Sequence, residues 1–223
     1  MRVDSVPNLR QFLGDHPEMA LKPSRGDQLS VSGIFRFDTQ YGDFRRVEDK
    51  YDLLIVIPEK FPSSIPLVYE LSQKLVPKSQ FHVNTDGSLC LGSRLHLLTK
   101  LRQNPTFTGF IETCLIPHLY AMSHKLQHGG DLVFGELEHG EVGTFVDYKD
   151  LFGLDGIEKV LPTLKVLGKK KGIANKMPCP CGCGKQLGRC RFNETIRKFR
   201  IGGITRGEFR QEYQRLISSG KSQ

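Results

Sequence analysis

The sequence predicts an α+β fold with a small cysteine-bearing module at its carboxyl-terminal end. Three observations support this prediction. Apolar residues first recur at helical spacing, then alternate as in strands, and then return to helical spacing. The strand-like segments follow one another over short links, which indicates an antiparallel meander. Four of the six cysteines lie between residues 179 and 190, in a region whose charge differs from that of the rest of the chain.

The amino-terminal part supplies one helix and three strands. A short helix is expected over residues 7–14, which begin at a proline and end at a glycine. Residues 29–37 alternate between apolar and polar side chains, as is typical of a half-buried strand. Residues 51–57 and 67–71 are predicted as two further strands, because the prolines between them cannot donate to a sheet and therefore bound the strands.

Helical spacing returns further along the chain. A helix is predicted over residues 94–102 and a longer one over 107–126, in which Pro117 should cause a kink or a break because it removes a backbone donor. A short helix is expected around 145–153. The carboxyl-terminal tail is predicted to form two helices that are separated at Gly202–Gly203.

Charge divides the chain into a large domain, a linker and a tail. Residues 1–164 carry 17 Lys+Arg and 21 Asp+Glu, a net charge of −4, whereas residues 165–223 carry 15 and 3, a net charge of +12. Residues 167–177 are basic and contain few large apolar side chains. We therefore expect a large domain at 1–166, a basic linker at 167–177 and a basic tail at 178–223.

The composition is that of an ordinary globular protein, with 38 % apolar and 25 % charged residues. No apolar run approaches the ~20 residues that a membrane span needs. The amino-terminal segment lacks the apolar core of a signal peptide. We therefore expect a cytoplasmic protein without a membrane partner. In a reducing compartment, a compact group of cysteines favours a metal site over disulfides.

The segment FHVNTDGSLCL places Cys90 after a tight turn, with His82 and Asn84 before it. The Asp-Gly pair between them is a strong turn signal, so Asn84 and Cys90 should be neighbours. A thiol can hold an acyl group as a thioester, and a side-chain amide can stabilise the oxyanion that forms when an amine attacks it. The residues alone leave a second interpretation open, because free cysteines are often core residues and leucines flank this one. His82 is likewise open to interpretation as a hydrogen-bonded structural histidine.

This segment resembles the active-site segment of ubiquitin-conjugating enzymes, which read His-Pro-Asn, a short turn and Gly-x-Ile/Leu-Cys-Leu. Upstream, YDLLIVIPEKFPSSIPLVYEL resembles the strand, proline-rich turn and strand of that family, and the resemblance covers roughly residues 5–150. It implies that Cys90 is the thioester-forming nucleophile, that Asn84 stabilises the oxyanion or the loop, and that His82 is mainly structural. Val83 replaces the family's proline, and the turn before Cys90 is shorter than usual.

The family often uses an acidic residue to orient the incoming lysine, and no residue of this chain matches that position clearly. Asp131, Glu136 and His139, in a glycine-rich loop, are the candidates for this role. The alternative is that these residues belong to a solvated loop.

More narrowly, the chain resembles bacterial ubiquitin-conjugating-like proteins that are encoded in CBASS antiphage operons beside a cGAS-like nucleotidyltransferase. This resemblance implies an acyltransferase that carries the C-terminal carboxyl of the nucleotidyltransferase on Cys90. The acyl group would pass to a lysine of an acceptor protein in antiviral defence. No adenylation module is visible in the chain, so the activated carboxyl must come from a partner or by an unusual route.

The tail segment MPCPCGCGKQLGRCRF contains Cys179, Cys181, Cys183 and Cys190. Four thiolates at this spacing can close a tetrahedral zinc site, and the glycines between them let the chain wrap around the ion. The segment resembles the SEC-C zinc motif of the SecA C-terminus, which reads CPCGSGKKYKKCC or ends in histidine. The resemblance places Cys179, Cys181 and Cys190 on a structural Zn²⁺. The fourth ligand of the motif falls on Arg191, which cannot bind zinc, so we expect Cys183 to take its place.

Two other functions stay open. The first is a catalytically inactive, zinc-containing adaptor that binds protein or nucleic acid through the basic tail. Nucleic acid is the less favoured partner, because the tail lacks the interleaved aromatic residues of a single-strand platform. The second is a cysteine hydrolase of such conjugates, which would need His82 or His139 beside Cys90. Cys114 lies on an apolar helical stripe and is predicted to be a core residue.

Overall fold

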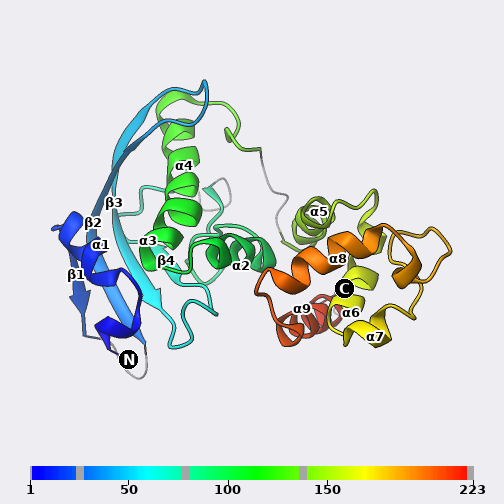
Figure 1. Ribbon diagram of the computed structural model, residues 1–223. Helices are drawn as coiled ribbons and strands as arrows, with labels where there is room; N and C mark the ends of the chain where they lie inside the picture. Colours follow the sequence, from blue (N-terminus) through cyan, green and yellow to red (C-terminus); the bar gives the residue numbers. More distant parts are fainter. Residues whose placement is uncertain (1, 24–27, 77–80, 136–139, 220–223) are drawn as a thin grey trace. The chain divides into compact units, whose positions relative to one another are not determined.

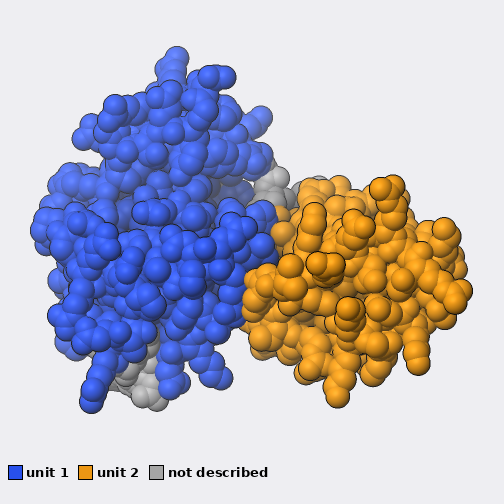
Figure 2. Space-filling model, in the orientation of Figure 1, with its two compact units in different colours: residues 1–136 blue, residues 137–223 orange. Residues whose placement is uncertain are grey.

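The computed structural model describes residues 2–23, 28–76, 81–135 and 140–219. The chain divides into two compact units, residues 1–136 and residues 137–223, which are coloured separately in Figure 2. The units are called unit 1 and unit 2 below.

Unit 1 is built on a four-stranded antiparallel meander in the order β1-β2-β3-β4, which confirms the α+β class and the predicted meander. One helix precedes the sheet, as predicted. The first strand was not expected from the sequence, because it has only four residues and buries only Met19, too little to show alternation. The elements are α1 (Leu9–Asp15), β1 (Met19–Lys22), β2 (Leu29–Thr39), β3 (Val47–Ile57) and β4 (Leu67–Glu70).

The apolar face of the sheet forms the core of unit 1. On β2, Val31 and Phe35 are fully buried whereas Arg36 is exposed, as the alternation predicts. The ring of Phe12 on α1 stacks on Phe35 with 6.1 Å between centroids, so the first helix closes one edge of this core. Gly33 has a φ of +145°, and a Cβ there would lie 2.0 Å from the carbonyl oxygen of Glu18, so only glycine allows β1 and β2 to approach.

The helices that follow the sheet are α2 (Arg94–Gln103), α3 (Phe107–Phe110) and α4 (Ile116–His128). A π-helical stretch at Ile111–Leu115 lies between α3 and α4, directly before Pro117 in the first turn of α4. The backbone stays helical on both sides of this stretch, so a local change in hydrogen bonding takes the place of the break predicted at Pro117. Cys114 is buried within the π-helical stretch, as predicted, and α4 lies against β3 (Figure 1).

Unit 2 is helical in the part that the structure describes. The predicted break at Gly202–Gly203 is confirmed, and the longest helix described, α9, has 14 residues. No helix within residues 2–23, 28–76, 81–135 and 140–219 combines the length and the hydropathy that crossing a bilayer requires. The helices of unit 2 are α5 (Gly140–Phe152), α6 (Val160–Leu167), α7 (Lys171–Ala174), α8 (Phe192–Ile201) and α9 (Arg206–Ser219).

The predicted linker at 167–177 differs from the division of the structure, which falls between residues 136 and 137. Helix α6 packs against α9, and Leu167 at its end is fully buried. Ala174 in α7 is buried as well. The lysines between these two residues are exposed. The sequence of residues 167–177 resembles a basic linker because its lysines face the solvent. The apolar residues that hold it in unit 2, Leu167 and Ala174, are few and widely spaced.

Candidate functional site

Cys90 lies at the end of a tight antiparallel turn. Val83 pairs with Leu89 across this turn, and the N–H of Cys90 donates to the carbonyl of His82 at 2.6 Å. Leu89 is buried in the core of unit 1. The turn therefore brings His82 and Cys90 opposite each other in the backbone, immediately before α2.

The turn is attached to the last strand of the sheet. The N–H of Leu89 donates to the carbonyl of Val68 at 2.7 Å, and Ser88 pairs with Tyr69. Both partners belong to β4. The position of Cys90 is thus fixed by the meander, which explains why the short strand β4 matters for the site.

Asn84 is held inside the turn by its backbone and its side chain. Its N–H donates to the carbonyl of Ser88 at 2.8 Å, and its Nδ2 donates to Ser88 Oγ at 3.0 Å. Ser88 Oγ in turn donates to Asp86, and this hydrogen bond lowers the pKa of the Asp86 carboxyl. Ser88 and Cys90 are two residues apart on an extended segment, so their side chains share one face. The amide of Asn84 is therefore held by Ser88, two residues before Cys90.

The Cys90 thiol is half-buried, and this burial raises its pKa. The backbone N–H of Gly92 bonds to the sulfur and acts in the opposite direction. Gly92 has a φ of +135°, a conformation that favours glycine, and it precedes the first turn of α2. The sequence analysis missed this residue, although a glycine two positions after the cysteine and next to a serine N-cap is a visible signal.

His82 is buried, with a φ of +49°, and supports the turn through its carbonyl. His118, in the first turns of α4, lies close enough for the two imidazoles to interact. Its Nε2 is buried and makes no hydrogen bond within the described residues, and burial together with the charge of His82 holds the pKa of His118 at about 3. No local sequence signal could have found this pair, because it joins residues 36 positions apart.

Of the three candidates for orienting a lysine, only Asp131 lies within the described residues. Asp131 is exposed after α4. Glu136 and His139 lie outside the described residues. Of the predicted site residues, Cys90, Asn84 and His82 are the ones that share one turn in the described structure.

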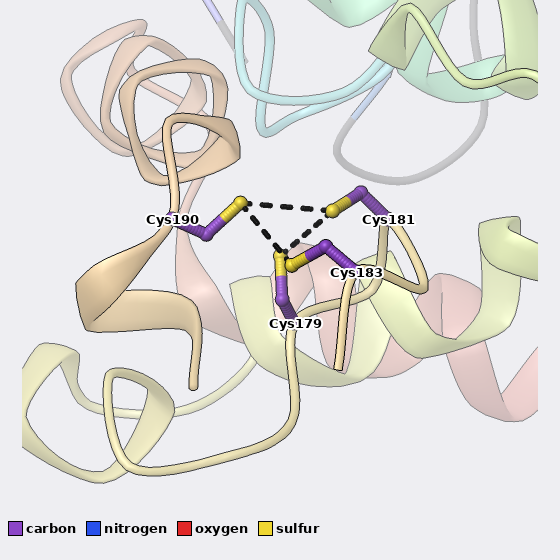
Figure 3. A group of neighbouring side chains, drawn as sticks. All are labelled: Cys179, Cys181, Cys183 and Cys190. Atoms are coloured by element: carbon purple, nitrogen blue, oxygen red, sulfur yellow. Dashed lines mark hydrogen bonds between the residues drawn. The ribbon is translucent and has the colours of Figure 1, made fainter. Parts of the chain in front are cut away.

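Unit 2 holds the four clustered cysteines, whose sulfur atoms all lie within 4.8 Å of one another (Figure 3). The Cys179–Cys181 sulfur distance is 3.3 Å, and Cys190 Sγ lies 3.6 Å from both Cys181 and Cys183. A hairpin positions three of them, with the N–H of Cys179 bonded to the carbonyl of Lys185 at 2.8 Å. Cys190 comes from the segment just before α8.

This donor set fits zinc. Thiolates that bind one zinc ion at ~2.3 Å lie about 3.8 Å apart at the corners of a tetrahedron, close to the sulfur separations found. Cys183 belongs to the cluster, whereas the side chain of Arg191 is exposed. The backbone N–H of Lys185 lowers the pKa of Cys183 to about 7, which favours the thiolate that a metal requires. The cluster is thus compatible with a zinc site that includes Cys183.

Comparison of the chain with family models, with curated proteins and with solved structures gave no match.

Proposed function

We propose that the chain is an acyltransferase of the ubiquitin-conjugating type, which holds the C-terminal carboxyl of a protein as a thioester on Cys90. The observation on which the proposal depends is the placement of this cysteine. A half-buried thiol ends a turn that Asn84 anchors, and the turn lies between an antiparallel meander and a helix. The sequence of this turn and of the strands before it carries the family resemblance.

The reaction has two steps. In the first, Cys90 Sγ bonds to the acyl carbon of an activated carboxyl, the bond from that carbon to the activating group breaks, and the thiol proton passes to solvent. In the second, a lysine amine attacks the same carbon and loses a proton, while the carbon–sulfur bond breaks and Cys90 leaves as a thiolate. The carboxyl must arrive already activated by a partner protein.

Asn84 serves the second step. One hydrogen of its Nδ2 is used by Ser88 Oγ, so the other can donate to the oxyanion that forms on the acyl group. Losing one such donor typically costs ~10²–10³ in rate. His82 acts by positioning, because its carbonyl fixes the backbone of Cys90.

The state of the thiol favours conjugation over hydrolysis. A cysteine hydrolase activates its thiol with an adjacent base. Burial instead raises the pKa of Cys90, and no imidazole among the described residues contributes to this shift. A thiol that stays mostly protonated suits exchange with an already activated carboxyl, because a small thiolate fraction suffices there.

The partners are proposed from the resemblance. The acyl donor is the C-terminus of a cGAS-like nucleotidyltransferase of the CBASS type, and the acceptor is a protein with an accessible lysine. In unit 2, we propose that Cys179, Cys181, Cys183 and Cys190 hold a structural zinc ion. When bound, this ion supplies cross-links that stabilise a loop with little core of its own.

The test is formation of an adduct between the chain and the nucleotidyltransferase in the presence of an activating protein, followed on a non-reducing gel. We expect a band that thiols remove and that Cys90→Ala lacks. Cys90→Ser should give a related adduct that thiols do not remove, because an oxyester replaces the thioester.

Cys183→Ser is the control, since it removes a more exposed thiol, in unit 2, and should leave the adduct in place. An adduct that persists in Cys90→Ala would refute the assignment of the nucleophile. If no pairing gives an adduct, the inactive adaptor becomes the better description. Cleavage of a preformed conjugate would identify the hydrolase instead.

A further inference from the structure

Unit 2 contains a groove that the Cys90 chemistry and the cysteine cluster do not use. It lies where α8 ends and α9 begins, and its volume is about 400 Å³. Helix α6 lies beside both of these helices (Figure 1). The groove is lined mainly by Leu167, Arg200, Ile204, Thr205, Arg206 and Phe209.

The floor of the groove is apolar. Leu167 comes from the end of α6, Ile204 from the connection between the last two helices, and Phe209 from α9. All three residues are at least nine-tenths buried in unit 2. The groove opens above these side chains, and its volume leaves room for one aliphatic side chain, which would gain ~25 cal/mol for each Å² of apolar surface removed from water.

Two arginines stand at the rim of this floor. Arg200 lies in the last turn of α8, and its Nη2 donates to the carbonyl of Val166 at 2.9 Å, which fixes the guanidinium. Arg206 begins α9 and is exposed. Burial and the charge of Arg206 lower the pKa of Arg200. In the described part of unit 2, neither guanidinium forms an ion pair with a carboxylate.

The acidic residue closest along the chain, Glu208, takes part in the cap of α9. Glu208 accepts a hydrogen bond from the N–H of Thr205 at 2.6 Å, and its own N–H donates to Thr205 Oγ1 at 3.2 Å. This pair is a capping box, so the carboxylate is engaged at the start of α9. The groove is thus lined by an apolar floor and by two arginines, of which Arg200 is held by its hydrogen bond to Val166.

We propose that this groove binds an acidic segment of a partner protein, with one aliphatic side chain in the hollow and flanking carboxylates on Arg200 and Arg206. Guanidinium groups form bidentate hydrogen bonds with carboxylates. The net charge of +12 on residues 165–223 accelerates the approach of such a partner. A single-stranded nucleic acid fits less well, because Phe209 is the only aromatic residue among the described residues that line the groove, whereas single-strand sites stack successive bases on several rings.

The proposal goes beyond the acyl transfer, since it needs neither Cys90 nor an activated carboxyl. The test uses the full-length protein and a short fluorescein-labelled peptide of aspartates and glutamates with one central leucine, followed by fluorescence anisotropy. We expect saturable binding that Arg206→Gln weakens by about tenfold, the effect of losing one charge-assisted hydrogen bond. Arg200→Gln should act in the same direction.

Arg197→Gln is the matched control, because Arg197 is exposed on α8, does not line the groove, and its loss changes the net charge equally. It should weaken binding less than about twofold, since Arg197 does not line the groove and an exposed charge there is partly screened by salt. A peptide with serine in place of leucine should bind more weakly. Equal losses in Arg197→Gln and Arg206→Gln, equal affinity for the serine peptide, or tighter binding of an oligothymidine would each overturn the proposal. Thermal melting of each variant checks that unit 2 is folded.

Discussion

At the scale of single residues, the environment of Cys90 makes a prediction about its reactivity. Because burial raises the pKa of this thiol, a smaller fraction is thiolate at neutral pH than in an unfolded chain. The rate of alkylation by iodoacetamide should therefore increase with pH around a midpoint above the ordinary value of about 8.5. Peptide mass spectrometry separates Cys90 from the other cysteines. A midpoint at or below that of an unfolded peptide would contradict the prediction that burial raises the pKa of Cys90.

Gly92→Ala sharpens this experiment. Alanine is strained at a φ of +135°, so the N–H should turn away from the sulfur, the pKa of Cys90 should rise further, and alkylation at neutral pH should slow. Gly42→Ala is the control, because Gly42 also has a positive φ, with no atom near the added Cβ. It should leave the alkylation profile unchanged.

The residues of the candidate site were predictable to different degrees. Cys90 and Asn84 could be placed together because an Asp-Gly turn is a local signal. Cys183 could be placed in the sulfur cluster because its spacing from the other three cysteines is also a local signal. The approach of His118 to His82 could not be predicted, because it depends on how α4 packs against the turn. Contacts of this kind follow from tertiary packing rather than from neighbouring residues.

At the scale of elements, a polar network links β3 to α4. The Tyr51 hydroxyl and Ser123 Oγ lie 2.7 Å apart, and Ser123 Oγ donates to Asp49 at 2.6 Å. Lys74 completes the network with an ion pair to Asp49 at 2.5 Å. Burial opposes the ionisation of Asp49, but the hydrogen bonds from Lys74 and Ser123 outweigh it and lower the pKa of this carboxyl.

Ser123→Ala should lower the free energy of unfolding by about 1–3 kcal/mol, because it leaves the buried Tyr51 hydroxyl without its partner. Urea denaturation measures this change. The double variant Tyr51→Phe/Ser123→Ala should cost less than the sum of the two single changes, since the hydroxyl that was left unpaired is then absent. Additive losses would show that the two side chains do not interact.

The strands illustrate how far periodicity predicts an element. Alternation identified most of β2, because one face of that strand is buried. The second half of β3 was predicted from an apolar segment that prolines bound. The beginning of β3 was missed, since residues 47–50 are mostly charged. These residues pair with the end of β2, and Arg46 forms an ion pair with Asp38 next to them. The strand extends there because its backbone is paired, which side-chain hydropathy does not report.

At the scale of the whole molecule, the two units should respond differently to removal of metal. Chelation should lower the thermal stability of unit 2 and leave unit 1 unchanged, because the cysteine cluster lies entirely in unit 2. Cys183→Ser should reduce the zinc content of the purified protein, measured by atomic absorption, whereas Cys114→Ser should leave it unchanged. Full zinc content in Cys183→Ser would exclude this residue as a ligand.

The core of unit 2 also constrains how the chain could have been assembled from separate genes. The Tyr148 hydroxyl of α5 donates to the buried Glu212 of α9 at 2.8 Å, and α6 packs against that same helix. A recombination breakpoint at residue 166 would leave both α5 and α6 behind and expose the apolar side of α9. A breakpoint that transfers residues 137–223 as one segment would keep the cysteine cluster together with these packing contacts.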